Sequence, residues 1–323
     1  MRTIPIRGRV PDVLRRALCS LILVAVSTST LASCSSDDAG SGHPIVAVSM
    51  YPIEEIVRTL AGTDLDVLAL VPPGSEAHSY DPTPQQLTEL EQADLAVYLG
   101  GGFQPNVEKA VGSLGDRTTR VDLLNSVNLL PVTDPLAGTG TAAESTSGAN
   151  DPHVWLDPRR MADMTAAVAD AITRRWPDLT EVVNQRAGDY VRSLNALDAD
   201  LRSGLTSCQR TVIVTTHRAF AYLADAYGLT QVAIAGISPG EEPSAQTLQA
   251  LADFARAQGV TTVFFESTVP DDLAATLAGE IGASTAVLNT VESLNSEQLT
   301  NGTDYASEMR TNLAVLRTAL GCT

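Results

Sequence analysis

The sequence predicts an α/β fold of two lobes, each a parallel sheet flanked by helices, joined by a single long helix. Three observations lead to this prediction. Short apolar runs alternate with amphipathic runs over residues 43–124, and the same alternation returns over residues 208–320. Such alternation with short connections is typical of parallel sheets that carry helices on both faces. A long stretch without proline lies between the two regions, and 323 residues are enough for two domains.

Each predicted element rests on its hydrophobic period and on the turn residues at its ends. Gly62 and Gly228 follow helical runs and are expected to end them. Thr83 stands before Pro84 and is expected to cap the start of another helix. The predicted strands are 45–50, 65–71, 94–100, 117–124, 210–217, 230–236, 260–267 and 284–289. The predicted helices are 53–62, 82–93, 104–114, one that ends before Pro177, 218–228, 244–259, 270–282 and 304–320.

The connecting helix is predicted over residues 178–205. Leucines from Leu194 to Leu205 fall at helical spacing, and Gly188 is the one potential breaker before the end. A single helix of this length would extend roughly 40 Å and cross a whole molecule. The alternative is two shorter helices broken near Gly188. The predicted domains are 44–177 for the first lobe, 178–207 for the linking helix and 208–323 for the second lobe.

Residues 1–33 have the features of a secretion signal. Five arginines precede an apolar run that is too short and too rich in Ser and Thr to span a membrane. The run ends in Leu-Ala-Ser-Cys at Cys34, which resembles the bacterial lipobox, where cleavage leaves the cysteine as a lipidated N-terminus. The alternative is an ordinary signal peptide with a chance cysteine. We expect residues 34–43 to be a flexible tether, with the lipid anchoring the chain at the extracytoplasmic face of the cell membrane.

The net charge indicates which partners the chain can bind, and the cysteine content indicates the compartment in which it folds. The net charge of −17 argues against nucleic acid, whose phosphates would be repelled, and suits a small cation or simple solubility. Cys19 would leave with the signal and Cys34 would carry lipid, so Cys208 and Cys322 remain as an even pair in an oxidising compartment. We therefore predict a disulfide between them, and two free buried thiols are the alternative.

Three of the four histidines occupy comparable places in this arrangement. His78 follows the second predicted strand, His153 precedes a helix, and His217 ends the first strand of the second lobe. Ligands of open α/β sheets bind beyond the carboxyl ends of the strands, so these histidines are expected to meet in a cleft between the lobes. Imidazole is a good zinc ligand, and zinc takes four ligands in a tetrahedron. For each histidine alone, a hydrogen-bonded structural role is the alternative.

Several motifs together resemble the metal-binding lipoproteins of bacterial ABC importers for zinc and manganese, the TroA-like or ZnuA-type receptors. They are "PPGSEAHSYDPTP", "VYLGGGFQPNVEKAV", "DPHVWLDP", "TTHRAFAYLADAYGL", "GISPGEEPSAQTLQAL" and "FFESTVPDDLAATLAGEIGA". The resemblance implies a helical-backbone metal receptor with one metal ion in the cleft. It also implies delivery of that ion to a membrane permease driven by a separate ATPase. We expect such a receptor to be a monomer.

The resemblance also implies a set of metal ligands. Its first three members are His78, His153 and His217. The manganese branch typically has a glutamate in place of His217, so nitrogen at this position favours Zn(II) over Mn(II). The fourth family ligand is a carboxylate, and Glu292 in "VLNTVESL" matches the zinc-branch pattern, with Asn289 where other relatives have an aspartate. Glu266 in "FFES" is the second candidate. The alternative for Glu292 is a residue at the start of a helix that faces solvent.

Residues close to the ligands in sequence are candidates to support the site. A zinc-bound imidazole usually donates its second N–H to an acceptor, and Asp151, Asp157 and Glu76 could supply one. For each of the three, the alternative is a role as a loop or cap residue. The rings of Trp155 and Tyr80 are expected to pack around the site rather than to bind the ion.

The function implied by these patterns is a zinc receptor and not an enzyme. The loop 134–151 contains no histidine, so the metal-scavenging role of the His-rich loops in many zinc-branch members is not expected of it. The alternatives are a manganese receptor of the same family, a zinc hydrolase with an open coordination position, and a surface adhesin. The chain lacks a His-Glu-x-x-His motif, and four protein ligands would leave no position for a reactive water.

Overall fold

The computed structural model describes residues 42–133, 149–240, 243–268 and 270–323. The predicted signal segment 1–33, the tether with Cys34 and most of the loop 134–151 lie outside these ranges. Within the described residues, none of the helices is both long and apolar enough to cross a membrane.

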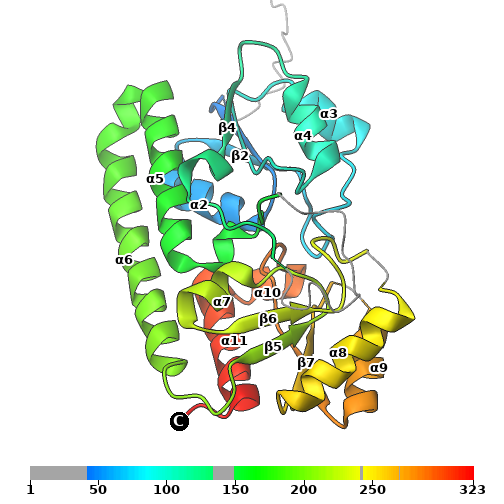
Figure 1. Cartoon of the computed structure of the whole chain (residues 1–323). Helices are drawn as coiled ribbons and strands as arrows, with labels where there is room; N and C mark the ends of the chain where they lie inside the picture. The colour runs from blue at the N-terminus through cyan, green and yellow to red at the C-terminus, as the bar shows by residue number, and fades with distance from the viewer. Residues whose placement is uncertain (1–41, 134–148, 241–242, 269) are drawn as a thin grey trace, which may run out of the picture. The chain divides into compact units, whose positions relative to one another are not determined.

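The first lobe is a four-stranded parallel sheet with strand order β2-β1-β3-β4 (Figure 1). Its strands are β1 Ile45–Val48, β2 Asp66–Ala69, β3 Leu95–Tyr98 and β4 Thr119–Asp122. Its helices are α2 Tyr51–Ala61, α3 Pro84–Leu90, α4 Pro105–Gly112 and α5 Pro158–Arg175, with short 3-10 turns η1 Leu123–Ser126 and η2 Val154–Leu156.

The second lobe repeats the arrangement with strand order β6-β5-β7-β8, again all parallel. Its strands are β5 Val212–Thr215, β6 Thr230–Ala233, β7 Thr262–Phe265 and β8 Ser284–Val287. Its helices are α7 Ala221–Tyr227, α8 Ala245–Ala257, α9 Asp272–Ile281, α10 Ser296–Thr300 and α11 Tyr305–Leu320. The predicted order of strands and helices is confirmed, and α10 is an additional element.

The helix boundaries follow the expected capping residues. Thr83 caps α3 by accepting a hydrogen bond from the backbone N–H of Gln86, and Pro84 occupies the first turn. Gly62 ends α2 at a φ of 60°, and Gly228 ends α7 in the left-handed conformation, which glycine adopts without steric cost.

The linking helix is α6, Thr180–Gly204, which follows a single 3-10 turn, η3 Pro177–Leu179. It is continuous, so the alternative of a break near Gly188 is wrong. Leu194, Leu197 and Leu201 are fully buried on one face. Helix α6 runs beside α5 and also packs against α2 of the first lobe and α11 of the second (Figure 1). One helix therefore supports both sheets.

Replacing Gly188 with alanine is expected to stabilise the protein. Glycine in a helix interior costs about 0.5–1 kcal/mol relative to alanine, and a β-carbon here would meet Arg192 Nη1 at an ordinary 3.7 Å. The check is the free energy of unfolding from denaturant titration, with Gly228→Ala as the control, since its φ of 70° should make that substitution destabilising. A loss of stability in the Gly188 variant would contradict a continuous α6.

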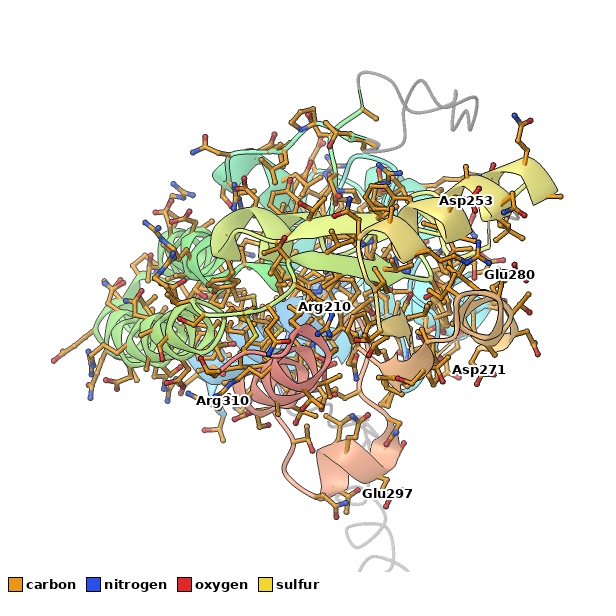
Figure 2. All side chains as sticks on the ribbon, turned by 60° about the horizontal axis from the view of Figure 1, so that its bottom comes forward. Arg210, Asp253, Asp271, Glu280, Glu297 and Arg310 are labelled. Carbon is orange, nitrogen blue, oxygen red and sulfur yellow. A yellow bond between two sulfur atoms is a disulfide. The ribbon has the colours of Figure 1, made fainter. Side chains whose placement is uncertain are left out.

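Most of the buried apolar side chains form one core that crosses between the lobes. It includes Ile53 of α2, Leu201 of α6 and Leu288 after β8. Ion pairs join neighbouring helices at the surface, as between Asp200 of α6 and Arg310 of α11. Figure 2 labels Arg310. The two lobes therefore share one apolar core.

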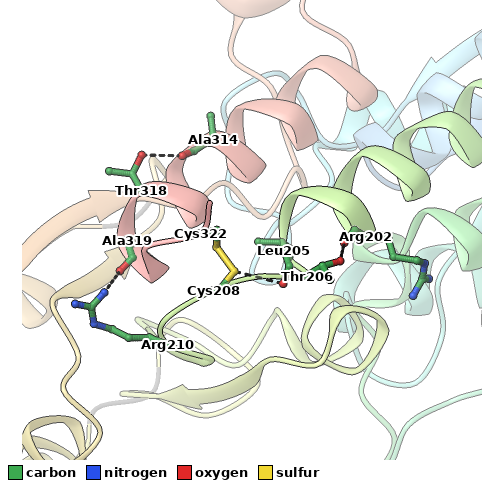
Figure 3. The surroundings of a disulfide bond; sticks show 9 residues. All are labelled: Arg202, Leu205, Thr206, Cys208, Arg210, Ala314, Thr318, Ala319 and Cys322. Atoms are coloured by element: carbon green, nitrogen blue, oxygen red, sulfur yellow. Dashed lines mark hydrogen bonds between the residues drawn. A yellow bond between two sulfur atoms is a disulfide. The ribbon is translucent and has the colours of Figure 1, made fainter.

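The predicted disulfide is present between Cys208 and Cys322 (Figure 3). The segment after α6 pairs with the segment after α11, since Cys208 and Cys322 form a β-bridge and the N–H of Arg210 donates to the carbonyl of Leu320. The bond ties the start of the second lobe to the end of its last helix.

Candidate metal centre

Four predicted side chains come together between the lobes: His78, His153, His217 and Glu292. Each offers one ligand atom, and these four atoms lie within 4.8 Å of one another. Glu292 Oε1 is 3.7 Å from His78 Nε2 and 3.8 Å from the Nε2 atoms of His153 and His217. None is more than 7% exposed. The arrangement is a His₃Glu cluster with one carboxylate oxygen facing three ring nitrogens.

His78 is placed by a tight turn in the loop after β2. The carboxylate of Glu76 accepts the backbone N–H of His78 at 2.7 Å and that of Ser79 at 2.8 Å. Glu76 thus shapes the loop and does not bind the imidazole, so its predicted role as a ring acceptor is wrong. A cavity of about 530 Å³ reaches the site at His78, between Phe103 of the first lobe and Leu273 of the second.

His153 begins the 3-10 turn η2 and is fully buried. Asp151 Oδ1 accepts both its backbone N–H at 2.8 Å and its Nδ1–H at 2.9 Å. This fixes the ring so that Nε2 faces the cluster, as predicted for a metal-binding imidazole and its acceptor. Asp157, the other candidate acceptor, instead caps α5 through the N–H of Arg159 and pairs with Arg160, so that prediction is wrong.

His217 lies just beyond the carboxyl end of β5. Its Nδ1 is 2.5 Å from Glu266 Oε1, which also accepts from the hydroxyl of Thr216. Its backbone carbonyl accepts from the side chains of Thr215 and Gln231. Glu266 was the second candidate for fourth ligand, but here it orients His217 and leaves Nε2 facing the cluster.

Glu292 is presented by a loop after β8. Val291 before it has a φ of 57°, the one non-glycine residue in the left-handed region within the described ranges. This conformation costs a β-branched residue about 1–2 kcal/mol. Asn289 supports it by accepting the N–H of Val291 at 2.7 Å, and donates to Glu308 at 2.8 Å. Asn289 therefore shapes the loop that carries the carboxylate.

Aromatic rings enclose the first-lobe side of the cluster. The ring centroid of Phe103 is 4.4 Å from that of His78, and Trp155 is 5.2 Å from His153. Trp155 packs beside the site as predicted. Tyr80 contacts α3 instead, donating its hydroxyl to Gln86. The apolar wall limits water access and strengthens electrostatic interactions inside.

Burial and mutual charge set the protonation of the cluster. Burial raises the pKa of Glu292, but the three facing imidazoles outweigh it and hold the pKa at about 2. Burial lowers the pKa of His153 below its usual value, although Asp151 acts in the opposite direction. Burial also acts to lower the pKa of His217, but the Glu266 carboxylate prevails and raises it. Glu292 is therefore ionised at neutral pH, as a metal ligand must be.

Two atoms at the centre of the cluster point to a cation. Among the described residues, His217 Nε2 and Glu292 Oε1 are buried and have no hydrogen-bond partner. Leaving buried polar atoms unpaired is costly, and native proteins rarely do so without a bound ligand or water. Three imidazole nitrogens and one carboxylate oxygen make a donor set that fits a tetrahedral zinc ion.

Replacing Glu266 with glutamine is expected to shift the pH dependence of zinc binding. Protons compete with zinc for His217 Nε2, and because the pKa of His217 is raised, zinc affinity starts to fall at a higher pH than for an ordinary histidine. In the Glu266→Gln variant the pKa of His217 drops, so zinc affinity starts to fall at a lower pH than in the unsubstituted chain. At alkaline pH the affinity itself should fall about 10–100-fold, because the ring loses its charged orienting partner.

The measurement is competition against a zinc chelator at a series of pH values. Asp253→Asn on the surface of α8 is the control and should match the unsubstituted chain. Coinciding pH profiles for the Glu266 variant and the unsubstituted chain would contradict the assigned role of Glu266.

The fold and the cluster together define the class: a two-lobed α/β receptor whose lobes are joined by a long helix and share one buried His₃Glu site. Residues 46–319 match the family described as zinc-uptake complex component A, periplasmic. The chain belongs to this family, ZnuA, which confirms the resemblance inferred from its motifs.

Two individual relatives support the assignment to this family. The chain is 33% identical over 300 residues to the zinc-binding lipoprotein AdcA of Streptococcus pneumoniae serotype 4, covering 92% of this chain and 60% of AdcA. It therefore spans less than two thirds of that relative's length. It is also 33% identical over 306 residues to the high-affinity zinc uptake system protein ZnuA of Bacillus subtilis, covering 94% of this chain and 95% of ZnuA.

Two solved structures of zinc-binding proteins are also similar to this chain. The Zn(II)-bound ZnuA-like domain of S. pneumoniae AdcA is 32% identical with a TM-score of 0.72, covering 86% of this chain and 99% of that domain. The periplasmic zinc-binding protein TroA of Treponema pallidum is 26% identical with a TM-score of 0.74, covering 86% of this chain and 99% of TroA.

Proposed function

We propose that the chain is an extracytoplasmic receptor that captures one Zn(II) ion with His78, His153, His217 and Glu292 and delivers it to an ABC-type importer. The observation that carries this proposal is the buried cluster of four ligand atoms within 4.8 Å, centred on a carboxylate oxygen and a ring nitrogen that lack other partners. Binding of a divalent cation satisfies both atoms and offsets the buried negative charge.

The donor set favours zinc over manganese. Three nitrogen donors and one oxygen suit Zn(II), whereas Mn(II) prefers sites rich in carboxylate, carbonyl and water oxygens. The relatives named above as zinc-binding or zinc-uptake proteins support the same choice.

To deliver zinc, the chain needs a membrane importer as its partner and a position close to that importer. We propose a permease with its ATPase as the partners, and a lipid on Cys34 as the anchor at the outer face of the cell membrane. The name of the AdcA relative, a lipoprotein, supports the anchor. We further propose lobe boundaries of 44–177 and 208–323, with residues 178–207 as the link, because α6 ends at Gly204 and the disulfide segment follows.

A receptor is favoured over a zinc hydrolase. Hydrolytic zinc sites use three protein ligands and keep one position for water, with a general base beside it. Here Glu292 is the proposed fourth ligand, and the two carboxylates next to the cluster, Glu266 and Asp151, are engaged with His217 and His153. Four protein ligands bind the ion without activating water, which suits transport.

The test is zinc binding by the purified chain in competition with a chelator of known affinity. We expect one Zn(II) per chain, bound more tightly than Mn(II), and we expect His78→Ala to weaken it. His43→Ala is the matched control, because His43 faces Asp66 outside the cluster. Tighter Mn(II) binding would overturn the zinc assignment, and equal effects of the two substitutions would overturn the site.

A further inference from the structure

The loop that carries Glu292 follows β8 of the second lobe in sequence, but several of its hydrogen bonds go to the first lobe. Three of its carbonyl oxygens, spread over residues 290–294, accept bonds from three separate first-lobe segments. The bonds are Trp155 Nε1 to Thr290 O at 2.7 Å, Tyr51 N to Glu292 O at 3.3 Å, and Gly74 N to Leu294 O at 3.1 Å. The loop is therefore attached to the first lobe along its length.

Side-chain contacts add to this attachment. Ser293 Oγ accepts the N–H of Gly74 at 2.8 Å, and Ser293 is only 6% exposed. Val291 and Leu294 are buried in the core that the first-lobe helices share.

The change from one lobe to the other takes place over two residues. The N–H of Leu288 still donates to Phe265 of β7, and the backbone of Asn289 is held by Asn312 of α11 at 2.9 and 2.7 Å. The N–H of Val291 still bonds back to Asn289 at 2.7 Å, whereas the carbonyl oxygens of Thr290, Glu292 and Leu294 accept from the first lobe. Val291, with its left-handed conformation, lies at this junction.

His217, in contrast, is held by residues of the second lobe. Its ring is held by Glu266 at the end of β7, and its carbonyl is held by Gln231 of β6 and by the hydroxyl of Thr215. Each of these residues belongs to the second lobe.

We propose that the metal site divides three to one: His78, His153 and Glu292 form a unit carried by the first lobe, and His217 is the single ligand carried by the second. In this arrangement Trp155 is a positioning residue for Glu292, through its bond to Thr290. The inference rests on the proposed function in that the bound ion is zinc. It implies that a displacement between the lobes removes one ligand and leaves a two-histidine, one-carboxylate site that still binds the ion.

Hydrogen exchange on the metal-free chain tests, without zinc, whether the loop that carries Glu292 is held by the first lobe. Tyr51 and Gly74 donate their N–H groups to the Glu292 loop, whereas Leu130 of the first lobe donates its N–H to the hydroxyl of Tyr222 in the second lobe at 3.0 Å. We expect the protection factors of the Tyr51 and Gly74 amides to exceed that of Leu130 by about tenfold or more, because of these three amides only Leu130 bonds across the two proposed units. Equal protection at the three amides, or lower protection at Tyr51 and Gly74, would overturn the proposal.

Zinc affinity tests the division of ligands. We expect His217→Ala to weaken binding but keep one zinc per chain, and addition of Glu292→Gln in that background to weaken it further by about 100-fold. If Glu292→Gln has no effect once His217 is absent, the three-ligand unit does not exist. If the unsubstituted chain binds no zinc, the proposed function fails while the exchange result stands.

The role of Trp155 is tested by Trp155→Phe, which keeps an aromatic ring but removes the donor to Thr290. We expect about tenfold weaker zinc binding, both in the native background and with His217→Ala, and a changed absorption spectrum of the cobalt-substituted site. Trp176→Phe at the end of α5 is the matched control and should change neither. An unchanged cobalt spectrum and affinity for Trp155→Phe would overturn its positioning role.

Discussion

Replacing Glu292 with alanine is expected to lower zinc affinity by roughly 100-fold or more. Structural zinc sites bind with about 10–16 kcal/mol in total, so one of four ligands contributes about 3 kcal/mol. Glu292 is also the one carboxylate that faces all three imidazoles, and its low pKa keeps it charged across the physiological range. Its loss removes both a ligand and the charge that offsets the cation.

The measurement is competition with a chelator at neutral pH, together with thermal unfolding of the metal-free chain. Glu297→Ala provides the control, because Glu297 lies on α10 five residues further along and is exposed (Figure 2). Should the Glu292 variant bind zinc as tightly as the control while His78→Ala does not, the fourth ligand would have to be another group, with Glu266 the first to examine.

The second large effect concerns stability and not binding. Replacing Cys208 and Cys322 with serine opens a loop with a sequence separation of 114 residues. The chain-entropy description of crosslinks gives about 4–5 kcal/mol for a loop of this length. For a protein of this size that corresponds to a melting temperature lower by roughly 10 °C.

Zinc affinity at 25 °C should stay unchanged in the same variant, because none of the four candidate ligands contacts the disulfide segment in the structure. The check is calorimetry of the metal-free chain, followed by zinc titration well below the melting temperature. An unchanged melting temperature would show that the pairing of the segments after α6 and α11 is sufficient without the covalent bond.

The fold was predictable because its signals are local. Strand and helix order follows from hydrophobic period, and Thr83 and Gly62 mark boundaries that the structure confirms. Strand ends were less predictable. The run 210–217 reads as one strand, but the structure ends β5 at Thr215, because Thr216 and His217 turn out of the sheet toward Glu266. Helix α10 was missed, although Asn295 and Gln298 form a capping box that the sequence displays.

The candidate site was predictable in its members but not in all their roles. Asp151 was found because it lies two residues from His153, and local hydrogen bonds depend on short separations. Glu266 is 49 residues from His217, and only the pairing of β5 with β7 shows that it orients the ring. Likewise, nothing in the residues around Glu292 indicates that Val291 adopts a left-handed conformation or that the first lobe holds the loop.

The segments 130–132 and 149–151 of the first lobe pair with each other. Pro131 pairs with Asn150, and the N–H of Val132 donates to Ala149. Asp151, which orients His153, belongs to this pairing, since its N–H donates to the carbonyl of Leu130 at 2.9 Å, so the pairing helps to set the position of the histidine. Because main-chain groups make these contacts, substitutions of the exposed side chains of Ala149 and Asn150 should leave His153 in place.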